Sequence, residues 1–302
     1  MEMTQAIPKT AFEPEKNANK DAGRHARQKL MWGLFGLSSI INLAALLLIC
    51  GFLVINGLPA ISLSFLTEMP RDSMTAGGIL PCILGTVILS LGAMAVAFPL
   101  GVASAIYLNE YAAPGRTVKI IRLGIANLAG VPSVVFGLFG LAFFVTFFGL
   151  GVSILSGVLT LAILTLPVII GTAEEALKSV PQTYREASLG LGATKWQTIR
   201  LVVLPAAMPG MLTGAILGLS RAAGETAAIM FTAAVFFTPY LPTSIMDSVM
   251  ALPYHVYVLA TAGTEIDKTR PLQYGTSLVL ISLVLGMNLI AILYRAKLQK
   301  RR

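Results

Sequence analysis

The sequence predicts an all-α polytopic membrane protein with six transmembrane helices. Apolar residues make up 56% of the 302 residues and charged residues 12%, whereas soluble domains carry about 25% charged residues. Long uncharged segments alternate with short segments that hold nearly every lysine and arginine. About 20 helical residues cross the ~30 Å of hydrocarbon in a bilayer, so each long uncharged segment is expected to span a membrane.

The chain begins with a polar segment, residues 1–29, that mixes charge with Pro, Asn and Gln and shows no apolar period. This composition is typical of disorder, and we expect a disordered cytoplasmic tail. The first apolar segment, 31–57, is too long for the apolar part of a cleaved signal peptide and is expected to be the first transmembrane helix. The last residues, 296–302, are expected to form a basic cytoplasmic C-terminus.

Five further helices are expected within one transmembrane domain, residues 75–295. Their apolar segments are 77–108, 124–149, 152–172, 206–237 and 272–294. Three prolines lie inside these segments, Pro99, Pro132 and Pro167, and each is expected to bend its helix because it cannot donate a backbone hydrogen bond.

Basic residues set the expected orientation of the helices. In the six-helix arrangement, 18 of the 22 Lys and Arg residues fall on the side that carries both chain ends, whereas Arg71, Lys268 and Arg270 fall on the opposite side. The positive-inside rule therefore predicts that both termini are cytoplasmic. The net charge of +8 follows from this topology and from attraction to anionic lipid, so we expect no nucleic-acid partner.

The remaining basic residue, Arg221, lies inside the fifth segment, about 17 Å along a helix that starts near Gly210 and hence near the bilayer midplane. Glu225 follows four residues later on the same helix face, where the two side chains can touch. Small residues at Gly210, Gly214 and Gly218 allow another helix to approach closely. Two interpretations stay open: an ion pair that fixes helix packing, or a guanidinium that binds an oxyanion while Glu225 orients it or accepts a proton.

The segment between the fourth and fifth helices, about 173–205, is the most informative part of the chain. Two Ser/Thr–Gln pairs have the spacing of capping boxes, Ser179 with Gln182 and Thr194 with Gln197. Gly190 and Gly192 lie between the pairs and can supply a turn. We therefore expect two short helices joined at a glycine hinge on the cytoplasmic side.

The same segment resembles the EAA loop of ABC importer permeases, whose pattern is Glu-Ala-Ala, three residues, Gly, nine residues, then Ile-x-Leu-Pro. The matching residues are Glu186-Ala187-Ser188, Gly192 and Val202-Val203-Leu204-Pro205. The resemblance implies the type I ABC importer permease fold and a loop that docks on an ATP-binding subunit. By position, Glu186 would make the polar contact with the ATPase and Gly192 would permit the turn, while Ala187, Leu204 and Pro205 complete the coupling residues.

No catalytic or metal site is expected in this chain. The GxxxxGK[ST] loop that holds nucleotide phosphates does not occur in the sequence, so ATP is expected on partner subunits and no cofactor on this chain. Cys50 and Cys82 lie in apolar segments and are expected to be small buried residues. His25 is expected in the tail and His255 in an outer loop, with no catalytic cluster at membrane depth. A transporter subunit is therefore favoured over a membrane-embedded enzyme.

Three further segments resemble the phosphate-specific permeases: 105–116, 131–139 and, most specifically, 221–233, which is similar to the A-type subunit. The resemblance implies that Arg221 and Glu225 line a phosphate path, with Ser133 and Thr226 as hydroxyl donors. It also implies a second, C-type permease subunit, a dimer of ATP-binding subunits and an extracytoplasmic phosphate-binding protein, which act by alternating access in a bacterial cytoplasmic membrane. A permease for another oxyanion (sulfate, molybdate or phosphonate) stays open as the alternative.

Overall fold

The computed structural model describes residues 18–71, 76–238, 240–262 and 266–300. The chain divides into two compact units, Met1–Phe52 and Leu53–Arg302. Helix α1 (Ala18–Gly57) begins in the first unit and ends in the second. Helices dominate the described residues, which agrees with the predicted all-α class.

In the first unit, α1 begins at Ala18 and continues into apolar residues that are largely exposed, such as Trp32 and Leu48. The expectation of a disordered tail is therefore wrong for residues 18–29, and residues 1–17 lie outside the described residues. Helix-forming Ala, Lys, Arg and Gln are frequent between 18 and 29, so the apolar helix can continue into this polar segment. Uncovered apolar side chains along the rest of α1 suit a lipid environment.

The second unit contains the remaining helices and a short antiparallel strand pair. Its long helices are α3 (Leu80–Ile106), α6 (Ile154–Lys178), α9 (Leu204–Gly224) and α12 (Ile266–Lys300). Its shorter helices are α2 (Leu63–Thr67), α4 (Arg116–Ala129), α5 (Ser133–Gly140), α7 (Gln182–Gly190), α8 (Lys195–Thr198), α10 (Ala227–Thr232) and α11 (Leu252–Thr261). A 3₁₀ turn covers Leu58–Ala60, π-helical turns cover Tyr107–Tyr111, Leu141–Phe147 and Ile199–Val203, and the paired strands are β1 (Pro70–Arg71) and β2 (Ala76–Gly77).

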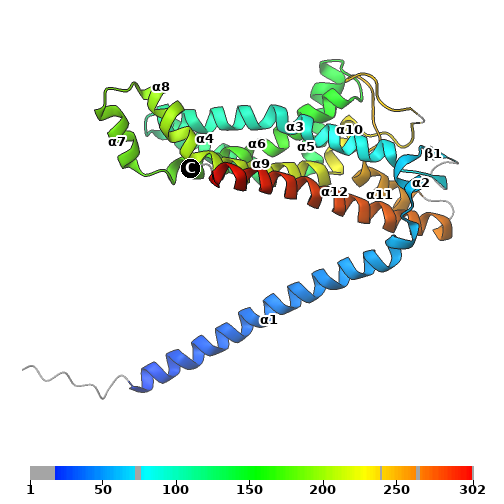
Figure 1. Cartoon of the computed structure of the whole chain (residues 1–302), viewed down its shortest axis with the longest axis horizontal. Coiled ribbons are helices and arrows are strands. Elements are labelled where there is room, and N and C mark those ends of the chain that lie inside the picture. The colour runs from blue at the N-terminus through cyan, green and yellow to red at the C-terminus, as the bar shows by residue number, and fades with distance from the viewer. Residues whose placement is uncertain (1–17, 72–75, 239, 263–265, 301–302) are drawn as a thin grey trace, which may run out of the picture. The chain divides into compact units, whose positions relative to one another are not determined.

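Helix α6 packs against both α3 and α9 in the second unit (Figure 1). The glycines predicted to allow a close helix approach face α6. A methyl group on Gly210 would lie 2.7 Å from Cβ of Ala176, and one on Gly214 would overlap the Thr172 side chain. The close approach is therefore confirmed, and it explains why small residues occupy this face of α9.

Five described helices are long and apolar enough to cross a membrane, and the bent pair α4 and α5 supplies a sixth span if the two are counted as one. With the π turn after α5 included, this pair runs from Arg116 to Phe147 and takes in most of the predicted segment 124–149, and its helices differ in direction by 100°. Pro132 precedes α5 and has no N–H, so the chain turns between the end of α4 and the start of α5. Helices α3 and α6, in contrast, continue through Pro99 and Pro167.

The predicted fifth helix, 206–237, is broken. It starts earlier than expected, since α8, a π turn and α9 form one apolar run over Lys195–Gly224. It stops at Gly224, because Glu225 takes an extended conformation with ψ 128°. Between α10 and α11, the described residues (233–238 and 240–251) form no helix or paired strand. In Figure 1, α7 and α8 lie at one end of the second unit, and β1, α2 and α11 lie at the opposite end.

Candidate functional site

Arg221 lies half-buried in the last turn of α9, next to the break in the predicted fifth helix. Glu225 lies beyond the end of α9. Its Oε1 accepts hydrogen bonds from the backbone N–H groups of Ala227 (3.1 Å) and Ala228 (3.4 Å). The carboxylate therefore caps α10, at a helix N-terminus where negative charge is favourable.

The expectation that Arg221 and Glu225 touch is wrong. Within the described residues, neither an ion pair nor a hydrogen bond links the two side chains. The spacing argument required a continuous helix, whereas Gly224 ends α9 and Glu225 caps the next helix instead. In the described part of the chain no acceptor contacts the Arg221 guanidinium, so its five N–H donors are available to a ligand or a partner subunit.

Helix α10 packs in parallel against α5. A methyl group on Gly137 would lie 3.0 Å from Cα of Ala228, and one on Gly140, almost one turn later, would lie 2.8 Å from Cγ2 of Thr232. From the first contact to the second, the residue number rises along both α5 and α10, so the two helices run in the same direction. The starts of α5 and α10 therefore lie toward the same end of the pair, with Ser133 four residues before Gly137 and Ala227 one residue before Ala228.

This register brings three of the four expected pathway residues to one end of the α5–α10 pair. Ser133 is the first residue of α5, Thr226 follows Glu225 and immediately precedes α10, and both Ser133 and Thr226 are half-buried. Arg221 lies about one turn before the break. Irregular backbone at membrane depth has to be covered by protein or line a cavity, and broken helices are typical of transport sites.

The loop after α6 contains two helices, and one of its two expected capping boxes is confirmed. Thr194 Oγ1 accepts from the Gln197 N–H (3.3 Å), and Gln197 Oε1 accepts from the Thr194 N–H (2.8 Å). The Ser179–Gln182 box is wrong, because Ser179 ends α6 and its Oγ donates back to an α6 carbonyl. Pro181, which has no side-chain acceptor, occupies the capping position of α7.

Gly192 supplies the turn between α7 and α8. Its φ of +83° is a left-handed conformation that favours glycine. Gly190, the other candidate, is the last residue of α7. The second helix of the loop is not short, because α8 continues through the π turn Ile199–Val203 into α9.

The expected coupling residues fall into two sets. Glu186 and Ala187 are exposed on α7, and Gly192 is exposed in the turn. Leu204 and Pro205 are half-buried at the start of α9. One set is therefore accessible to a partner, and the other lies where the loop joins a spanning helix.

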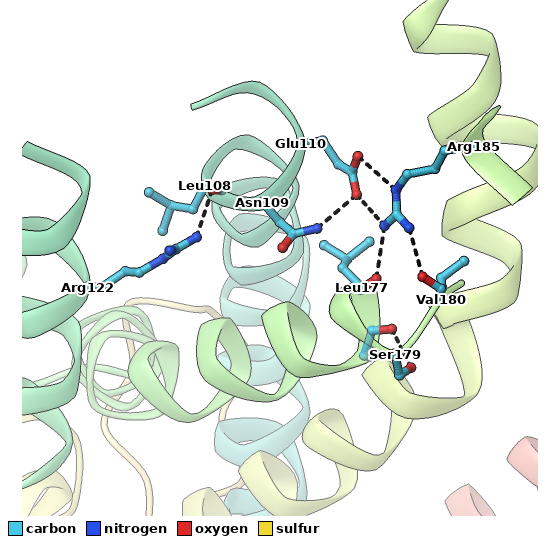
Figure 2. Close-up of polar contacts among 9 residues, drawn as sticks. Leu108, Asn109, Glu110, Arg122, Leu177, Ser179, Val180 and Arg185 are labelled. Carbon is cyan, nitrogen blue, oxygen red and sulfur yellow. Dashed lines mark hydrogen bonds and ion pairs between the residues drawn. The ribbon is translucent and has the colours of Figure 1, made fainter. Parts of the chain in front are cut away.

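An ion pair that the sequence did not reveal anchors α7 to the rest of the unit. Arg185 contacts Glu110, in the π turn after α3, with Nη2–Oε1 at 2.7 Å and Nε–Oε2 at 3.3 Å (Figure 2). The two side chains are only 13% and 8% exposed. Arg185 also donates to the carbonyl oxygens of Leu177 (3.0 Å) and Val180 (2.8 Å), and Asn109 donates to the Glu110 carboxylate (2.9 Å). One guanidinium thus joins α7 to the ends of α3 and α6.

A second acidic residue, Glu174 on α6, joins α4 to the same region. Its side chain is 9% exposed and contacts Arg122 Nε (3.3 Å) and Lys178 Nζ (3.2 Å). Arg122 also donates to the carbonyl oxygen of Leu108 (3.0 Å). Glu110 and Glu174 both lie near the ends of apolar segments, where a buried carboxylate needs a cation, and that placement is the signal that could have identified them.

A family model for the inner membrane component of binding-protein-dependent transport systems matches residues 97–302. The probable ABC transporter permease protein YqgI of Bacillus subtilis is 34% identical over 279 residues, which cover 89% of this chain and 95% of the relative. The phosphate transport system permease protein PstA of Xylella fastidiosa is 34% identical over 78% of this chain and 81% of its own length. PstA 1 of Mycobacterium tuberculosis is 36% identical over 75% of this chain and 73% of its own length.

Solved ABC transporters share the fold at low sequence identity. A bacterial alginate ABC transporter chain superposes with a TM-score of 0.59 at 17% identity, covering 95% of this chain and 98% of that one. A chain of the MetNI methionine ABC transporter gives 0.55 at 20% identity, covering 73% and 94%. The predicted importer permease fold is thereby confirmed. Together with the family model and the curated relatives, it shows that this chain belongs to the binding-protein-dependent transport system inner membrane components, the permease subunits of ABC importers.

Proposed function

We propose that this permease moves inorganic phosphate across the bacterial cytoplasmic membrane. The observation that carries the proposal is its similarity to the PstA phosphate permeases of X. fastidiosa and M. tuberculosis, at 34% and 36% identity over 78% and 75% of the chain. The break between α9 and α10 supports the proposal because it offers groups that suit an oxyanion.

At the break, the guanidinium of Arg221 offers parallel N–H donors that match two oxygens of a phosphate. Ser133 and Thr226 would add hydroxyl donors. Glu225, fixed by its capping bonds to α10, would accept a hydrogen bond from a protonated phosphate and repel a fully deprotonated one. The site would hold phosphate transiently, because an ion bound too firmly at the midplane would not leave.

ATP hydrolysis in this family lies in separate subunits, so the chain itself is not an enzyme. We infer that Glu186 and Ala187, exposed on α7, contact such a subunit, while Gly192 allows the turn. Leu204 and Pro205 would pass the movement of the loop into α9. ATP would bind the partner subunits, and no cofactor is assigned to this chain.

The proposed assembly contains a C-type permease subunit that completes the path opposite Arg221, a dimer of ATP-binding subunits and an extracytoplasmic phosphate-binding protein. The positive-inside rule favours an orientation with both termini and α7 in the cytoplasm. Closure of the ATP-binding subunits would switch the path between its two openings. An importer of sulfate, molybdate or phosphonate is the second candidate, since an arginine can bind any of these oxyanions through the same parallel donors.

Uptake competition tests the substrate. Cells without their own phosphate permeases would express this chain with its partner subunits and receive labelled phosphate. We expect uptake that excess unlabelled phosphate abolishes and that excess sulfate, molybdate or phosphonate leaves unchanged. Phosphate uptake no greater than in empty cells, with labelled sulfate, molybdate or phosphonate taken up instead, would transfer the proposal to that anion.

A further inference from the structure

Helix α7 has almost no apolar attachment to the rest of the second unit. None of its described residues, Gln182 to Gly190, is buried. A cavity of about 700 Å³ with polar residues such as Asn109, Gln182 and Thr198 in its wall lies beside it. Apolar burial, which usually fixes a helix in place, therefore contributes little here, and polar contacts have to hold α7.

Within the described chain, the side chains of two α7 residues, Ser188 and Arg185, make polar contacts beyond the helix. The Ser188 and Thr198 hydroxyl groups are 2.9 Å apart, which ties α7 to α8 within the loop itself. Arg185 makes the contacts outside the loop, two with the Glu110 carboxylate and one with the Leu177 carbonyl at the end of α6. It also donates to the Val180 carbonyl, which lies between α6 and α7. The attachment of α7 to the ends of α3 and α6 thus depends on one buried guanidinium (Figure 2).

The neighbouring residue, Glu186, points elsewhere. Successive residues of a helix are rotated by about 100°, and Glu186 is exposed whereas Arg185 is turned inward. The two adjacent residues therefore have different roles. The exposed Glu186 carboxylate is available to a partner, whereas the inward Arg185 guanidinium binds Glu110 and Leu177 at the ends of α3 and α6.

We propose that Arg185 and Glu110 are positioning residues that lock α7 to the ends of α3 and α6, so that a displacement of α7 passes into these two spans as well as into α9. The inference rests on the proposed docking of α7 on an ATPase subunit. Arginine is required because its rigid fork reaches a carboxylate and two carbonyls at once, whereas a lysine ammonium is a point charge on a flexible stem.

The test uses the complete transporter in proteoliposomes with its binding protein. Arg185→Gln leaves Glu110 buried without its cation, so the paired variant Glu110→Gln/Arg185→Gln, which removes both charges, guards against a folding defect. Arg71→Gln is the matched control, since Arg71 belongs to an exposed ion pair with Glu68. For each variant, the ratio of phosphate imported to ATP hydrolysed is measured.

We expect the ratio of phosphate imported to ATP hydrolysed to fall by about five- to 150-fold in Arg185→Gln and in the paired variant, which is the range of typical coupling energies. Arg185→Lys should give an intermediate ratio, and Arg71→Gln should leave the ratio unchanged. Spin labels on Thr183 of α7 and Ala103 of α3, in a Cys50→Ala background, report the lock directly. The distance distribution should broaden in the variants.

Either a wild-type ratio of phosphate imported to ATP hydrolysed or an unchanged distance distribution in the paired variant would overturn the inference. The distance measurement is independent of the substrate. If the wild-type transporter imports no phosphate, the proposed function fails, and broadening of the distribution still supports the lock while its absence refutes it.

Discussion

Replacing Arg185 by Met should destabilise this permease far more than replacing a typical surface arginine. The substitution keeps a long apolar side chain but removes four hydrogen-bond contacts. It leaves the Glu110 carboxylate 8% exposed, with Asn109 as its remaining hydrogen-bond donor in the described chain. Breaking a buried ion pair by removing one partner costs about 3–5 kcal/mol, because an uncompensated charge stays buried.

The exposed pair Glu68–Arg71 gives the comparison. Its atoms are 3.5 Å apart and its side chains are 41% and 68% exposed, so Arg71→Met should cost at most about 1 kcal/mol. The melting temperature of the purified protein in detergent would be measured for both variants. At roughly 2–4 °C per kcal/mol, the range for chains of about 150–250 residues, Arg185→Met should lower it by up to about 6–20 °C, and Arg71→Met by a few degrees at most.

The double variant Glu110→Gln/Arg185→Met separates burial of a charge from loss of packing. It removes the carboxylate's charge together with the guanidinium, so a large part of the lost stability should return. Equal shifts for Arg185→Met and Arg71→Met would refute the claim that this ion pair is a buried anchor.

Three further predictions concern local structure. Gly192→Ala should lower the free energy of unfolding by about 1–2 kcal/mol, because alanine is strained at the φ of +83°. Gly190→Ala in α7, where a Cβ meets nothing within 4 Å, should raise it by up to ~1 kcal/mol. The two variants should therefore shift the melting temperature in opposite directions. Burial lowers the pKa of His255, on α11 outside the six spans, to about 4. An unfolded histidine protonates near pH 6.5, so stability should be full above that pH and lower by about 2 kcal/mol at pH 5, and His255→Phe should abolish this part of the pH dependence of melting. Thr86 Oγ1 accepts from the buried N–H of Leu252 (2.8 Å), so Thr86→Val should cost about 1–3 kcal/mol in the same assay.

Features that depend on local chemistry could be predicted from the sequence. The spanning segments follow from composition alone, since uncharged helices of this length need a bilayer. The Thr194 capping box and the turn at Gly192 follow from short-range hydrogen bonding and backbone sterics. The Ser179 box failed because α6 extends to Lys178 and Pro181, not Ser179, occupies the capping position of the next helix.

Features that depend on tertiary contacts could not be predicted. Gly224 is tolerated within many membrane helices, so the sequence alone does not indicate that α9 ends there. The extended conformation of Glu225 and its capping of α10 then invalidate the helical spacing from Arg221. Glu110 and Arg185 are 75 residues apart, and no local pattern pairs them.

Phosphate uptake by Arg221 variants tests the central claim most directly. Wild type, Arg221→Lys and Arg221→Ala would be compared in the same cells, with membrane amount and assembly with the ATPase subunit measured for each. We expect Arg221→Ala to assemble normally yet import at least about tenfold less phosphate, because losing a single charged hydrogen-bonding group costs roughly 1.5–3 kcal/mol. Arg221→Lys should retain part of the uptake. Wild-type uptake by Arg221→Ala would contradict the central claim and leave this arginine with a structural role.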